Sequence, residues 1–123
     1  MKKFFICSLV CFAFVSAKAQ FVAGTKWKGT LHLDSPTDVI LDFRTDTVEA
    51  ISPDDNSSIE LMKYTVQDTV LTLQKISGQS ECDETVIGKY KMEMKDDGIT
   101  LTVIDDTCED RGPVLDDTKW IKE

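Results

Sequence analysis

The sequence predicts an all-β fold, with about eight short strands in an antiparallel up-and-down β-barrel. Apolar and polar residues alternate in short runs, and turn-forming residues interrupt these runs at intervals of about ten positions, the pattern of an all-β domain. No stretch of convincing length repeats its apolar residues with a helical period. An open meander would leave two unpaired edges, and closing it into a barrel removes both. A two-layer β-sandwich fits the same alternation and stays open as the alternative.

Residues 1–19 are expected to be an export signal that is removed from the folded protein. Two lysines precede an apolar stretch over residues 4–15, and Ala17-Lys18-Ala19 supplies the small–x–small pattern of a signal peptidase site. The apolar stretch is shorter than the roughly 20 residues that a membrane-spanning helix needs. We therefore expect cleavage after Ala19 and no membrane insertion of the remaining chain.

The predicted mature domain, residues 20–123, is expected in the periplasm or outside the cell. Lipidation at Cys11 is not expected, because a lipoprotein signal needs a small residue before the cysteine and Val10 is a poor one.

The predicted strands carry apolar side chains at alternate positions, and their order along the chain sets the expected barrel. Trp27 near the first strand and Trp120 on the last suggest that these two strands meet. The strands are centred on residues 27–33, 39–43, 48–50, 62–66, 71–73, 90–94, 101–103 and 119–122.

Three predicted hairpins share one independent test, the pairing that a two-residue turn imposes. Turns at Thr45-Asp46, Gln67-Asp68 and Asp97-Gly98 each bring apolar residues of neighbouring strands opposite one another. A shift of one residue would mix the two faces instead. The expected opposite pairs are Phe43 with Val48, Leu41 with Ala50, Tyr64 with Leu71, Met62 with Leu73, Met94 with Leu101, and Met92 with Val103.

Cys82 and Cys108 are the cysteines that remain after removal of residues 1–19, and we expect them to form a structural disulfide. Such a bridge closes a loop of about 27 residues and stabilises the fold by roughly 3.5 kcal/mol in the chain-entropy model. Two cysteines and one distant histidine do not make a tetrahedral metal site. No metal and no cofactor is expected.

The charge of the chain excludes two classes of partner. Three of the 14 basic residues lie in residues 1–19, so the predicted mature chain keeps 11 of them against all 22 acidic residues, a net charge of −11. Such a surface repels nucleic acid and anionic lipid. The acidic clusters are expected to be solvated, with cation binding near the disulfide as the open alternative.

The chain resembles the lipocalin-like, or calycin-type, small barrels of exported bacterial proteins. The resemblance rests on Gly24-Thr25-Lys26-Trp27-Lys28-Gly29 and on Cys108-Glu109-Asp110-Arg111 followed by Trp120. It implies a cup that binds a ligand, with Arg111 packed over Trp27 at the closed end. The chain departs from the family pattern in that Gly24 lies three residues before Trp27 rather than two, and it shows no lid helix.

The inward side chains are expected either to fill the barrel or to line a cup for one small, mainly apolar ligand. Tyr64 and Tyr90 are the best polar candidates, because a buried hydroxyl needs a hydrogen-bond partner. The full set of candidate ligand-binding residues is Phe43, Met62, Tyr64, Leu71, Tyr90, Met92 and Leu101.

No catalytic residue is predicted, and an enzyme is not expected. The single histidine, His32, falls on the outer face by strand parity, and no nucleophile elbow or phosphate-binding loop is present. The alternative to ligand binding is a protein partner, contacted through the rim or through the N-terminal segment Gln20–Ala23 in the manner of a small protease inhibitor.

Overall fold

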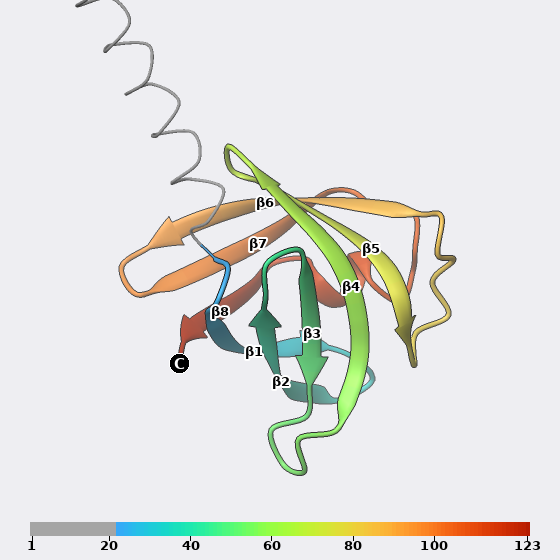
Figure 1. The fold of residues 1–123 in the computed structure, drawn as a ribbon, viewed down its shortest axis with the longest axis horizontal. Helices are drawn as coiled ribbons and strands as arrows, with labels where there is room; N and C mark the ends of the chain where they lie inside the picture. Colours follow the sequence, from blue (N-terminus) through green and yellow to red (C-terminus); the bar gives the residue numbers. More distant parts are fainter. Residues whose placement is uncertain (1–21) are drawn as a thin grey trace, which may run out of the picture.

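The computed structural model describes residues 22–123. These residues, with apolar and polar side chains in alternation, form a closed, eight-stranded, antiparallel up-and-down β-barrel (Figure 1). Each strand pairs with its neighbour in the chain, and β1 pairs with β8 to complete the circle. The predicted barrel is confirmed, and the sandwich is wrong. The signal peptide and the Cys11 prediction lie outside the described residues. The strands are β1 (Lys26–His32), β2 (Pro36–Phe43), β3 (Thr47–Ile51), β4 (Ser58–Gln67), β5 (Val70–Gly78), β6 (Ile87–Lys95), β7 (Gly98–Asp105) and β8 (Thr118–Lys122).

The closing seam of the barrel depends on one glycine. Gly29 in β1 lies opposite Trp120 in β8, and a Cβ at position 29 would lie 2.6 Å from the Trp120 ring. Glycine therefore lets the indole pack across β1. Trp27 and Trp120 are both buried in the core, which confirms that the two ends of the sheet meet.

The β2–β3 hairpin has the predicted register, with Phe43 opposite Val48 and Leu41 opposite Ala50. In the other two hairpins the predicted pairing is wrong, because each residue lies opposite a partner two positions away from the predicted one. In these hairpins Tyr64 lies opposite Leu73, Met62 opposite Lys75, Met92 opposite Leu101, and Met94 opposite Ile99.

Aspartates explain both displaced turns. Asp68 and Asp96 begin the two turns with positive φ angles of 56° and 54°, a conformation that aspartate tolerates better than most residues. Gly98, the expected turn residue, is instead the first residue of β7. Because a shift of two keeps the side-chain parity, the predicted inward face is retained, although Met94 at the end of β6 is half exposed.

The two ends of the barrel differ in their connections. Residues 44–46, 68–69 and 96–97 make short turns at one end, which we call the turn end. The opposite end, the loop end, carries residues 33–35, 52–57, 79–86 and 106–117, including the short helix α2 (Gly112–Leu115). Within residues 22–123, no helix is long and apolar enough to cross a membrane.

Candidate functional site

A cavity of about 280 Å³ lies at the loop end of the barrel. Inward positions of β1 to β4 supply most of its apolar wall, and α2 adds Val114 and Leu115. The β5–β6 loop and the segment after β7 supply polar groups. The wall consists of Leu31, Leu33, Val39, Leu41, Ala50, Ile59, Glu60, Met62, Gln79, Ser80, Asp110, Arg111, Val114 and Leu115.

Glu60 brings a carboxylate into this largely apolar wall. It shares the inner face of β4 with Met62 and Tyr64 and is only 7 % exposed. Its Oε1 accepts a hydrogen bond from the Ser80 backbone N–H at 3.2 Å, and the Ser80 hydroxyl donates to Oε2. Gly78 lies opposite Glu60 on β5, and any side chain there would collide with the Glu60 carboxylate. Glycine at position 78 therefore makes room for the buried carboxylate.

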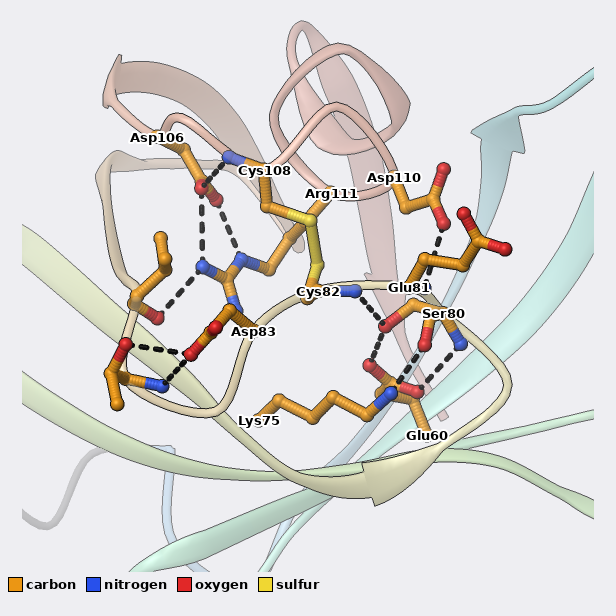
Figure 2. The surroundings of a disulfide bond; sticks show 12 residues. Glu60, Lys75, Ser80, Glu81, Cys82, Asp83, Asp106, Cys108, Asp110 and Arg111 are labelled. Carbon is orange, nitrogen blue, oxygen red and sulfur yellow. Dashed lines mark hydrogen bonds and ion pairs between the residues drawn. A yellow bond between two sulfur atoms is a disulfide. The ribbon is translucent and has the colours of Figure 1, made fainter.

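Arg111 forms the other charged part of the wall, in a buried ion pair that Figure 2 shows beside the disulfide. Its Nε donates to Asp106 Oδ2 at 2.6 Å, and its Nη2 donates to Asp106 Oδ1 and to the Val86 carbonyl, both at 3.1 Å. The side chains of Arg111 and Asp106 are 4 % and 0 % exposed. Among the described residues Nη1 has no hydrogen-bond partner, and less than 1 Å² of it is accessible.

Asp106 is ionised in this arrangement. Burial alone would raise its pKa, but hydrogen bonds from Arg111, from the Tyr90 hydroxyl and from the Cys108 backbone N–H outweigh burial and hold the pKa below the ordinary value of 3.8. Burial, together with the hydrogen bond to Asp106, raises the pKa of Tyr90 far above 10. The cluster therefore contains a neutral tyrosine and one compensated pair of charges.

The disulfide between Cys82 and Cys108 is present, as predicted, with a Cα–Cα distance of 5.4 Å. It joins the β5–β6 loop to the segment after β7, and both contribute to the cavity wall. The Glu81 backbone N–H also donates to Asp110 Oδ2 at 2.8 Å. The rim of the cavity is thus held by a covalent bond and a hydrogen bond (Figure 2).

The predicted ligand-binding residues divide between the cavity and the rest of the core. Met62 lies in the cavity wall. Phe43, Met92 and Leu101 instead surround a hollow of about 10 Å³ beside Trp27 and Trp120, which has room for about one water molecule.

Leu71, Tyr64 and Tyr90 are buried outside the cavity wall. The Tyr64 hydroxyl donates to the Arg44 carbonyl at the turn end, and the Tyr90 hydroxyl donates to Asp106. Both hydroxyls, expected to be polar contacts for a ligand, thus have partners inside the fold and do not line this cavity.

Arg111 does not pack over Trp27, which corrects the expectation drawn from the resemblance. The guanidinium of Arg111 is directed to Asp106 and Val86 near the loop end. Trp27 donates its indole N–H to Thr25 Oγ1 and lines the small hollow with Trp120. The physical reason is the buried Asp106 carboxylate, which binds a cation more strongly than an indole face does.

Sequence reasoning missed the polar residues of the cavity, namely Glu60, Gln79, Ser80 and Asp110. For Glu60 a signal existed, because it lies two residues before Met62 and four before Tyr64, on the same side of the strand. Gln79, Ser80 and Asp110 lie on loops, where strand parity gives no direction.

The acidic loops do not form an evident metal centre within residues 22–123, where no group of three or more histidine, cysteine, aspartate or glutamate side chains is arranged to hold an ion.

No family model matches the chain, and no curated protein or solved structure matches it significantly. The fold assignment rests on the strand pairing itself.

Proposed function

We propose that this protein is an exported binding protein that holds one small, mainly apolar molecule in the cavity at the loop end of its barrel. The observation that carries the proposal is the cavity itself. Its wall is mostly aliphatic and includes a few polar groups, which is the usual composition of a small-molecule site.

The size of the cavity limits the ligand. Its volume of about 280 Å³ lies near the lower limit of about 300 Å³ for ligand pockets. An eight-stranded barrel has room for side chains or for one small ligand. Since a water molecule occupies about 30 Å³ in the liquid, the ligand should contain roughly ten non-hydrogen atoms.

Export and the absence of catalysis are part of the proposal. The signal-like residues 1–19 support export, and the bridge between Cys82 and Cys108 suits an oxidising compartment. The resemblance to lipocalin-like barrels agrees with ligand binding, and the sequence carries no motif for catalysis.

Of the inhibitor-like segment predicted over Gln20–Ala23, the first two residues lie outside the described residues, and the described part favours the cavity over that alternative. Val22 is completely buried in the core, and the Gly24 backbone N–H donates to the Phe43 carbonyl at 2.8 Å. Val22 and Gly24 are therefore held by the barrel rather than available to enter the cleft of a partner. Nothing in the described residues points to a particular protein partner.

Filling the cavity tests the proposal. Ala50 lies on the inner face of β3 and contributes to the cavity wall, so Ala50→Leu places three more carbon atoms in the binding space. Thr102→Leu, on the outer face of β7, is the matched control. The test measures n-hexanol binding by isothermal titration calorimetry with the purified, oxidised protein.

We expect Ala50→Leu to weaken hexanol binding roughly tenfold or more, and Thr102→Leu to leave it unchanged. Both variants should keep the melting temperature within a few degrees. Equal hexanol binding by Ala50→Leu and the unaltered protein, or failure of the unaltered protein to bind any six-carbon apolar ligand, would overturn the proposal.

A further inference from the structure

Glu60 is a carboxylate of the cavity wall that forms no ion pair with a cation of residues 22–123. Its hydrogen bonds within the described chain come from Ser80, through a backbone N–H and a hydroxyl. The ion pairs found in residues 22–123 are centred on Arg44, Lys91 and Arg111, and none includes Glu60. A buried carboxylate with neutral partners alone is costly, so a cation that reached it from the cavity would be bound favourably.

Lys75 is the nearest candidate for an internal counter-ion. Its ammonium group donates to the Ser80 carbonyl, on the residue that also holds Glu60 (Figure 2). Lys75 does not belong to the cavity wall and forms no ion pair with Glu60 within 4.0 Å. Lys75 is therefore held at the Ser80 carbonyl, outside the wall to which Glu60 contributes.

Arg111 does not reverse the sign of the cavity. Asp106 compensates its charge through two hydrogen bonds at 2.6 and 3.1 Å. Its unpartnered Nη1 is accessible over less than 1 Å², so an anionic ligand has no surface there to contact. Asp110 adds a second carboxylate to the wall. The charges that remain uncompensated at the cavity are therefore negative.

We propose that the ligand is a small apolar amine, whose ammonium group binds the Glu60 carboxylate while its hydrocarbon part contacts the aliphatic wall. This inference rests on the proposed function and names the chemical class of the ligand. The net charge of the whole chain, −8, acts in the same direction, since it raises the local concentration of cations.

The test compares three ligands with the same hydrocarbon chain: n-hexylamine, n-hexanol and hexanoate, titrated at pH 7 into the purified, oxidised protein. A hydrogen bond to a charged group contributes about 1.5–3 kcal/mol, so hexylamine should bind roughly ten- to hundredfold more tightly than hexanol. Hexanoate should bind most weakly, because the Glu60 and Asp110 carboxylates repel it.

Glu60→Gln removes the charge and keeps the shape and an acceptor for Ser80. We expect the affinity of this variant for hexylamine to fall until it no longer exceeds the affinity of the same variant for hexanol. Glu93→Gln is the matched control, because Glu93 lies on the outer face of β6 with a side chain 57 % exposed. This control should retain the preference for the amine.

The outcomes separate the inference from the proposed function. Hexanol binding without a preference for hexylamine would overturn the inference and leave the proposed function standing, as would an unchanged preference in Glu60→Gln. Tightest binding of hexanoate would also overturn the inference. Failure of all three ligands to bind would contradict the proposed function. The amine-to-alcohol ratio of the unaltered protein gives a result even if Glu60→Gln does not fold.

Discussion

Replacing Asp106 by asparagine tests how much of the stability depends on the buried ion pair at the loop end. The Asp106 carboxylate accepts hydrogen bonds from Arg111 Nε and Nη2, from the Tyr90 hydroxyl and from the Cys108 backbone N–H. Asparagine has nearly the same shape, but one of its two polar atoms is a donor. That amide group would face Arg111 or Cys108, which are donors themselves, and Arg111 would become a buried cation without a counter-charge.

The expected loss follows from the burial of both partners, whose side chains are 4 % and 0 % exposed. Removing one member of a buried pair costs about 3–5 kcal/mol, because the other charge is left uncompensated. With a urea dependence of roughly 1.5–2 kcal/mol per M for a domain of this size, the unfolding midpoint should fall by about 2 M. Arg111→Met should also be destabilising, and Asp106→Asn should cost much less in the Arg111→Met background.

The pH dependence gives a second measurement of the same pair. The pKa of Asp106 in the folded protein lies below its ordinary value of 3.8. The ionised carboxylate therefore contributes its full stability above about pH 4, and this contribution disappears as the pH falls through the lower, folded-state pKa. Urea unfolding at a series of pH values should show the difference between the unaltered protein and Asp106→Asn shrinking below pH 4.

A loss smaller than about 1 kcal/mol at pH 7, the usual worth of a solvent-exposed pair, would refute this reasoning. Additive losses in the double variant would refute it as well, because they would mean that Asp106 and Arg111 contribute independently. Intact melting behaviour of an outer-face control, Asp38→Asn, would confirm that removal of a negative charge alone is not the cause.

Two further perturbations test the rim and the turn end. Reduction of the Cys82–Cys108 bridge, which spans a separation of 26 residues, should lower the free energy of unfolding by about 3.5 kcal/mol. Urea unfolding with and without dithiothreitol measures this loss. A change under about 1 kcal/mol would be inconsistent with a structural role. Tyr64→Phe should cost about 1 kcal/mol, because the hydroxyl donates to the Arg44 carbonyl. It should leave hexanol affinity unchanged, and a tenfold change in that affinity would show that Tyr64 does contact the ligand.

Strand parity predicted the inward face of the barrel but not its register. A side-chain period of two makes a shift of two residues invisible to any test that asks only whether apolar residues face one another. Met92 lies opposite Leu101 rather than Val103, and both arrangements pass that test. The deciding feature was backbone conformation at the turns, where Asp68 and Asp96 adopt the left-handed region.

The role of Arg111 was predicted incorrectly because the resemblance supplied its partner. The local sequence held another candidate, since Asp106 lies two residues before Cys108 and five before Arg111. A disulfide that fixes Cys108 also fixes these neighbours. A buried guanidinium needs a carboxylate more than it needs an aromatic face, so the nearby aspartate was the better prediction on physical grounds.

The position of the cavity follows from the sizes of the inward side chains along each strand. Toward the loop end, the inward residues of β1 change from Trp27 to Leu31, and those of β2 change from Phe43 to Val39. On β3 the wall ends in Ala50. The ring of Phe43 packs edge-on against Tyr64, with centroids 5.0 Å apart. Large rings thus fill the turn end, whereas short aliphatic side chains at the loop end leave space.

This gradient also explains why a carboxylate can lie inside the barrel. Glu60 occupies the buried inward position of β4 nearest to the loop that precedes this strand. There the inward side chains of the neighbouring strands are small, and loop residue Ser80 can supply hydrogen bonds. The same carboxylate two residues further along, at Met62, or four, at Tyr64, would lie deeper among buried side chains and farther from those donors. The cavity and its buried carboxylate therefore have the same cause: at the loop end the inward side chains are small, and loop residues lie within hydrogen-bonding distance of the strands.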